Sequence, residues 1–170
     1  MNLVFDSSPL IYFARSGTLQ IVAQVEGAKY LPPVVYTEVV TIGQAQGYPD
    51  AEITDHLIRQ GLFTVLAPKE KFTEVFQGLH RDLHSGEMEV LALAEDLQGI
   101  AILDDRIGRE IGEIFQIEVR GSVFILFTLV RKGIISTDNA KQTLRVMIRE
   151  GFRIGTEQYG AFLDLLDQIT

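Results

Sequence analysis

Two short apolar runs, far apart in the chain, each end in acidic residues at a position where a helix should begin. Residues 3–5 are followed by Asp6, and residues 100–103 are followed by Asp104 and Asp105. After the first run, Ser8 and Pro9 are typical of an N-cap and of the first helical position. Each run therefore predicts a strand, a tight turn and a helix, with the acids at the carboxyl end of the strand.

Further apolar runs alternate with stretches of helical periodicity along the chain. The predicted strands cover residues 3–5, 29–31, 62–66, 100–103 and 117–119. Strands that alternate with helices favour a parallel sheet covered by helices on both faces, which is an α/β fold. We predict one core domain over residues 1–135. Residues 136–170 are expected to add a layer of C-terminal helices packed on the same domain.

Composition restricts the class of protein and the kinds of site. The 170 residues include no Cys, which excludes disulfides, thiol nucleophiles and Cys-ligated zinc. We expect a cytoplasmic protein, because there is no secretory leader and no apolar stretch is long enough to cross a bilayer. The net charge is −8, yet residues 101–153 carry nine basic and seven acidic side chains. A locally basic region of this kind can bind a polyanion despite the overall charge.

The acids at the strand ends are the strongest functional signal. If the two strands are neighbours, Asp6, Asp104 and Asp105 converge at the edge where open parallel sheets bind ligands. Carboxylates this close repel one another, and a hard divalent cation is their natural partner. Each Asp alone could be a helix N-cap. Glu87 could be present only because the helix dipole favours an acid in the first turn. Glu38 is harder to explain structurally, because it lies within the apolar run of residues 34–40.

Five short motifs together carry a resemblance to a known family. They occur in the order Phe-Asp-Ser-Ser-Pro-Leu-Ile from residue 5, Leu-Pro-Pro-Val-Val-Tyr-Thr-Glu-Val from residue 31, Gly-Glu-Met-Glu-Val-Leu-Ala-Leu-Ala from residue 86, Ile-Leu-Asp-Asp-Arg from residue 102, and Gly-Ser at residue 121. This order and spacing resembles the PIN-domain nucleases, in a branch of unknown function with an Asp-x-Ser-Pro-Leu opening. The resemblance implies a Rossmann-like three-layer α/β/α sandwich.

The resemblance also implies an activity, namely a Mg²⁺- or Mn²⁺-dependent endoribonuclease that hydrolyses single-stranded RNA. It assigns catalysis and metal binding to four positions: Asp6, Glu38, Glu87 and Asp105. Asp104 is a neighbouring candidate for a metal ligand. Ser8 would support the first acid through a hydrogen bond. Arg106 and Arg109 could hold substrate phosphates, or could equally pair with Glu110 and Glu113. Many PIN nucleases have Asp in place of Glu87 and Thr in place of Leu103, so the surroundings of the metal differ here.

Other functions stay open at this point. A catalytically inactive RNA- or protein-binding module would use the same fold without the chemistry. The resemblance allows a toxin that pairs with an antitoxin protein, and a homodimer. His80 and His84 would share a helix face as a zinc site requires, but Gly86 interrupts that helix. Tyr12 and Tyr36 could stack on bases, although packing in the core explains both.

Overall fold

The computed structural model describes residues 1–76 and 85–169. Its five strands form one parallel sheet in the order β3-β2-β1-β4-β5. The strands are β1 (Asn2–Phe5), β2 (Ala28–Leu31), β3 (Thr64–Val65), β4 (Ile100–Ile102) and β5 (Glu118–Arg120). The predicted α/β fold with a central parallel sheet is confirmed.

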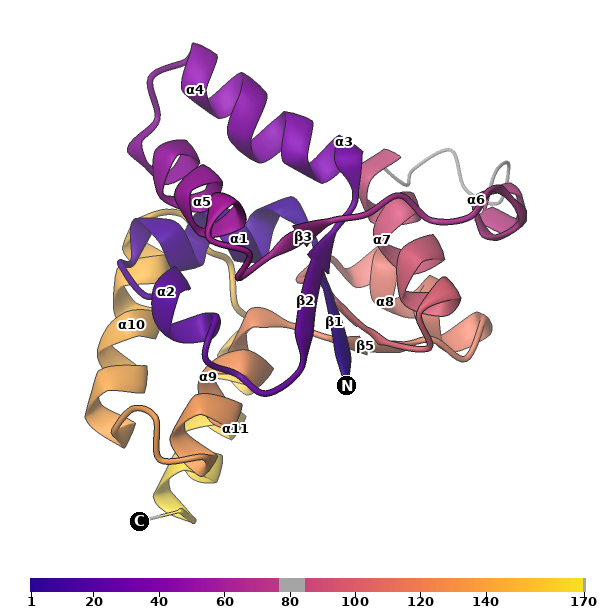
Figure 1. Cartoon of the computed structure of the whole chain (residues 1–170). Helices are drawn as coiled ribbons and strands as arrows, with labels where there is room; N and C mark the ends of the chain where they lie inside the picture. Colours follow the sequence, from indigo (N-terminus) through magenta and orange to yellow (C-terminus); the bar gives the residue numbers. More distant parts are fainter. Residues whose placement is uncertain (77–84, 170) are drawn as a thin grey trace.

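Helices cover both faces of this sheet (Figure 1). The helical segments are α1 (Ser7–Arg15), α2 (Leu19–Val22), α3 (Pro33–Tyr36), α4 (Gly43–Ala45), α5 (Pro49–Arg59), α6 (Glu70–Phe76), α7 (Ser85–Asp96), α8 (Arg106–Ile114), α9 (Ser122–Arg131), α10 (Thr137–Arg149) and α11 (Thr156–Asp167). On one face, α7 packs on β1 and β4 while α8 packs on β5. Helices α1, α9 and α10 pack together on the other face. Leu3, Val4 and Phe5 of β1 are fully buried, as expected for a strand between two helical layers.

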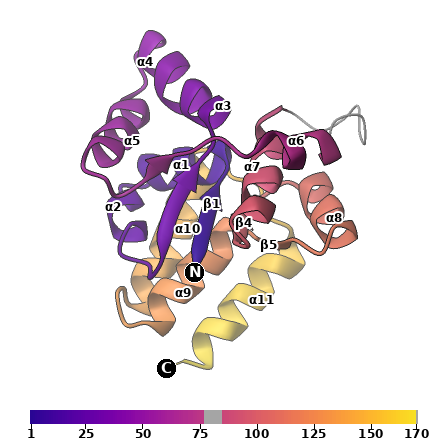
Figure 2. The same cartoon turned by 45° about the vertical axis from the view of Figure 1, so that its right-hand side comes forward.

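The C-terminal helices belong to the layer formed by α1 and α9. Helix α10 contacts α1 and α9, and α11 contacts α9 and α10. Figure 2 shows α11 crossing below β5, close to the edge of the sheet. The division at residue 135 stays a prediction. No helix among the described residues is long and apolar enough to span a membrane.

The start of α1 differs from the sequence prediction. The N-cap is Asp6 and the helix begins at Ser7, so the prediction of Ser8 as N-cap is wrong. Pro9 is the third residue of the helix instead of the first, which the missing N–H of proline still permits because the first-turn amides have no partner within the helix. This shift decides which of the two serines faces the acidic residues.

A π-helix, η1 (Thr37–Ile42), joins α3 to α4 in one continuous helical segment. Residues 39–42 are all β-branched, and side chains of this type fit poorly into a regular α-helix. Single π-turns inside helices are frequent at functional sites. Glu38 lies in the first turn of η1, so the unusual backbone and the unexplained acid of the sequence coincide.

Candidate functional site

The acidic residues gather where the winding of the sheet reverses direction. Strand β1 connects toward β2 on one side, whereas β4 continues to β5 on the other. The two strands pair in parallel with Phe5 opposite Ile102, and the N–H of Asp6 donates to the Ile102 carbonyl at 3.1 Å. Such a switch point is where open α/β sheets leave a crevice for ligands.

Asp6 is the buried centre of this group. Only 8% of its surface is exposed, and burial raises the pKa of its carboxyl to about 7. The N–H of Ser7 donates to the carboxylate and opposes this rise. The negative charges of three other acids raise the pKa further, in the order Glu87, Glu38 and Asp104. Carboxylates from three other segments of the chain therefore act on Asp6.

A serine holds Glu38 toward the group. The Ser7 hydroxyl donates to Oε2 of Glu38 at 2.6 Å, a length typical of a bond to an ionised acceptor. Ser7 is buried, whereas Glu38 is exposed on its helix. The sequence prediction gave the supporting role to Ser8, but no hydrogen bond from Ser8 to the acids is found among the described residues. Which of the two serines faces Glu38 depends on the residue at which α1 begins.

Helix α7 closes the group from the opposite face of the sheet. A Cβ atom placed on Gly86 would lie 3.6 Å from Oδ1 of Asp6 and 3.8 Å from Oε2 of Glu38. Both carboxylates therefore border the space that the missing side chain leaves. Glu87, the next residue, is 9% exposed. The first turn of this helix thus brings an acid and an open space to the same place.

Asp104 is fixed by the start of α9. Its Oδ1 accepts from the Ser122 N–H at 2.8 Å, and its Oδ2 accepts from the Ser122 hydroxyl at 2.6 Å. Burial raises the pKa of Asp104, while both hydrogen bonds and the charge of Arg109 lower it. Ser122 was not predicted as a site residue. The Gly-Ser pair before an apolar helix is a signal for it, because first-turn N–H groups lack partners within the helix.

Asp105 has a different environment from Asp104. Its Oδ2 accepts from the N–H groups of Ile107 at 2.6 Å and Gly108 at 3.1 Å, so it is the N-cap of α8. Asp105 does not number among the charges that shift the pKa of Asp6. The metal-ligand role of Asp105 stays a prediction, and Asp104 is the acid of this strand end whose charge acts on Asp6.

The predicted phosphate-binding arginines divide in a similar way. Arg106 is exposed and pairs with Glu110 at 3.3 Å. Arg109 instead turns toward the strand end, where its Nη2 donates to the Asp104 carbonyl at 3.4 Å.

The two tyrosines make contacts outside the acidic group. Tyr12 packs edge-on against Phe152, and the Tyr36 hydroxyl donates to Asp55 at 3.3 Å, which agrees with structural roles for both tyrosines. His80 and His84 lie outside the described residues.

The donor set suits a hard divalent cation in its chemistry. All four side chains offer carboxylate oxygens, the ligands that Mg²⁺ and Mn²⁺ prefer. Within residues 1–76 and 85–169, no three acidic or histidine side chains already converge as a finished metal site. The fit therefore rests on the donor chemistry, on the mutual repulsion around Asp6 and on the space beside Gly86.

Comparison with known proteins identifies a similar solved structure and a matching family. Among solved structures, VapBC-1 from nontypeable Haemophilus influenzae matches with 19% identity and a TM-score of 0.49, over 72% of this chain and 98% of that chain. This likeness is too distant to assign a function. A search of curated proteins finds no significant match. The family model described as DUF3368, a PIN domain, matches residues 2–168 and so includes the C-terminal helices. The chain therefore belongs to this PIN-domain family.

Proposed function

We propose that this protein is a metal-dependent endoribonuclease that hydrolyses phosphodiester bonds in single-stranded RNA. The observation that carries the proposal is the buried carboxyl of Asp6, whose pKa burial and three neighbouring carboxylates hold near 7. A protein gains nothing in stability from burying an acid among other acids. Such an arrangement is frequent at functional sites, where perturbed pKa values cluster.

Asp6, Glu38, Glu87 and Asp104 would hold the cation, and we favour Asp104 over Asp105. An all-oxygen donor set with net negative charge supports this assignment, as does the space that Gly86 leaves between two of the acids. The Asp105 carboxylate already accepts two amide hydrogen bonds as an N-cap. The charge of Asp104 raises the pKa of Asp6, whereas Asp105 is not among the groups that shift it.

When bound, the cation would supply an acidified water molecule and would neutralise charge on the phosphate oxygens. The protein's own side chains prepare the site. Ser7 orients Glu38, and Ser122 keeps Asp104 in place with two donors. Without the cation, the Asp6 carboxyl retains a proton for part of the time at neutral pH, because its pKa is about 7, and binding of the cation would displace this proton. Arg109 offers positive charge next to Asp104, where an RNA phosphate would otherwise meet only acids.

The biological setting is proposed from the family resemblance. We propose a cytoplasmic protein that acts as the toxin of a toxin–antitoxin pair and forms a homodimer. Growth arrest on expression, relieved by a protein encoded next to it, would support the toxin role. A measured mass of one chain in solution would contradict the dimer.

Cleavage of a labelled single-stranded RNA with Mn²⁺ or Mg²⁺ tests the enzymatic proposal. We expect cleavage by the wild type, none in EDTA and none by Asp6→Asn. Asp138→Asn is the matched control, since Asp138 is an exposed acid in the first turn of α10, and it should cleave normally. Equal cleavage by Asp6→Asn and wild type would come from a contaminant and would refute the proposal. RNA binding without cleavage would favour the inactive binding module.

A further inference from the structure

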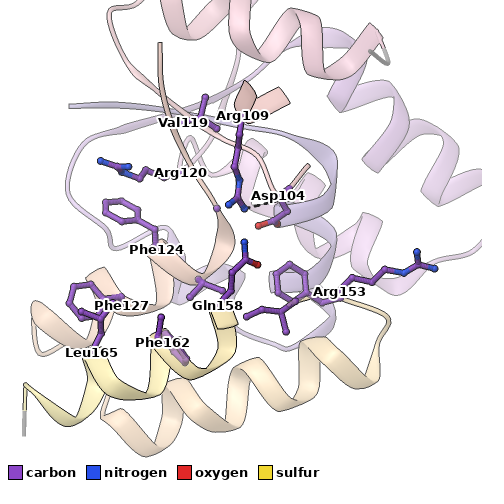
Figure 3. A pocket seen from close by; sticks show the side chains of 15 residues that line it. Asp104, Arg109, Val119, Arg120, Phe124, Phe127, Arg153, Gln158, Phe162 and Leu165 are labelled. Carbon is purple, nitrogen blue, oxygen red and sulfur yellow. Dashed lines mark hydrogen bonds between the residues drawn. The ribbon is translucent and has the colours of Figure 1, made fainter. Parts of the chain in front are cut away.

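A pocket of about 340 Å³ lies beside the acidic group, between the end of β5, helix α9 and helix α11. Asp104 and Arg109 line one end of it, and side chains of α9 and α11 line the other (Figure 3). Ligand pockets usually measure about 300–1,000 Å³ and combine an apolar wall with a few polar groups. This pocket has a suitable size and composition for one small ligand unit.

The α9–α11 end of the pocket is apolar and aromatic. Phe124 and Phe127 of α9 face Phe162 and Leu165 of α11 across it. Phe124 and Phe127 are only partly buried, so part of each ring is open to a ligand. Arg120, at the rim, lies 5.4 Å from the ring centroid of Phe124. Partly open rings next to an arginine form a surface on which a flat aromatic group can stack.

The opposite end of the pocket is polar. Arg109 and Gln158 point toward one another near Asp104 (Figure 3). The Nε atom of Arg109 is buried and has no hydrogen-bond partner among the described residues. A buried donor without a partner destabilises the folded protein. An acceptor oxygen bound here would remove that cost, and the guanidinium favours an anionic one.

Asp104 connects this pocket to the acidic group. Its carboxylate lines the pocket and is also one of the three charges that raise the pKa of Asp6. A ligand seated in the pocket therefore extends directly toward the proposed cleavage site. Three arginines line the pocket, namely Arg109, Arg120 and Arg153, together with a single acid, Asp104. The pocket is therefore locally basic, although the net charge of the chain is −8.

We propose that this pocket binds one nucleotide of the RNA substrate, next to the phosphate that is cleaved. The base stacks on Phe124 and Phe127, and Arg109 holds a phosphate oxygen. The Gln158 side chain, which can both donate and accept hydrogen bonds, can pair with polar groups at the edge of the base. A stacked base with its phosphate matches both ends of the pocket, whereas an apolar peptide segment leaves the Arg109 donor unsatisfied. The inference rests on the proposed ribonuclease function and specifies its substrate contact.

The test measures RNA binding rather than cleavage. A fluorescein-labelled single-stranded oligoribonucleotide is titrated with protein in EDTA, and anisotropy gives the Kd. We expect Phe127→Leu, which keeps an apolar side chain without a ring, to weaken binding about tenfold. Arg109→Gln should weaken binding and reduce the salt slope by about 0.7. Thermal melting establishes that each variant is folded.

Controls and an altered ligand make the test specific. Tyr48→Leu removes an exposed aromatic ring outside the pocket, and Arg131→Gln removes an exposed arginine at the end of α9. Both should bind RNA within twofold of wild type. An oligonucleotide with one abasic position at the pocket should bind wild type as weakly as the complete RNA binds Phe127→Leu.

The outcomes separate this inference from the proposed function. Wild-type affinity in folded Phe127→Leu and Arg109→Gln overturns the pocket assignment but leaves the nuclease proposal intact if cleavage needs Asp6. Equal losses in the control variants also overturn it, because binding would then be a general surface effect. A wild type that neither binds nor cleaves RNA refutes the proposed function and the pocket assignment with it.

Discussion

Replacing Asp6 by Asn should stabilise the protein when no divalent cation is present. Folding raises the pKa of this carboxyl from an ordinary value of 3.8 to about 7. At 1.36 kcal/mol per pKa unit, the ionised group costs the folded state about 4 kcal/mol above pH 7. Asn has nearly the same shape and carries no charge. We expect a gain of about 2 kcal/mol, since burying the amide also has a cost, and a Tm higher by about 4–8 °C.

The dependence on pH follows from the direction of this shift. The folded state binds a proton more tightly than the unfolded state between pH 3.8 and about 7. Wild-type stability therefore falls as the pH rises through this window, and the contribution of Asp6 is constant above it. The Asn variant should therefore be less stable than wild type by about 2 kcal/mol below pH 4, where only the cost of burying the amide remains, and more stable by about 2 kcal/mol above pH 7.

Thermal unfolding in EDTA, from pH 4 to 8, measures this difference directly. Adding Mg²⁺ at pH 8 should raise the Tm of wild type alone, because only wild type retains the complete set of ligands. A variant that is less stable than wild type at pH 8 would refute the electrostatic reasoning. A difference that does not change with pH would refute it equally.

Five other substitutions test individual side chains. Asp104→Asn should abolish cleavage and the Mn²⁺-induced rise in Tm. Asp105→Asn should retain both, because Asn is as good an N-cap as Asp. The opposite pattern would make Asp105 the ligand. Gly86→Ala should raise the stability of the protein without metal by up to about 1 kcal/mol, because Ala has the higher helix propensity. It should weaken Mn²⁺ binding in a calorimetric titration, because the added methyl group occupies the space between two acids. Unchanged Mn²⁺ affinity would exclude a metal from that space. Ser7→Ala should lower Mn²⁺ affinity and Ser8→Ala should not, and equal effects would contradict the hydrogen bond as the cause.

The sequence predicted the fold well because its signals are local. Continuous apolar runs that end in a helix start require a parallel strand buried on both faces, and β1 and β4 are such strands. The pairing of these two strands puts Asp6 beside the end of β4. The proximity of Glu38 to Asp6 could be expected only from the family resemblance, since nothing in its own helix predicts what lies opposite.

The sequence left open which serine and which aspartate belong to the site, because a shift of one residue at a helix start decides both. Ser7 and Ser8 are both plausible helix starts, and a shift of one residue decides which hydroxyl faces Glu38. Adjacent aspartates at the end of β4 are equally ambiguous, until α8 takes one as N-cap and α9 binds the other. The pocket between α9 and α11 depends on the packing of helices that are distant along the chain. No local pattern predicts such packing.

The central claim is that carboxylates from four separate segments share one divalent cation. Anomalous scattering from crystals soaked in Mn²⁺ tests it most directly. We predict one strong peak within ligand distance of Asp6 and of at least two of Glu38, Glu87 and Asp104, absent from crystals of Asp6→Asn. A peak that persists without the Asp6 carboxylate, or Mn²⁺ bound only elsewhere on the protein, would contradict the account.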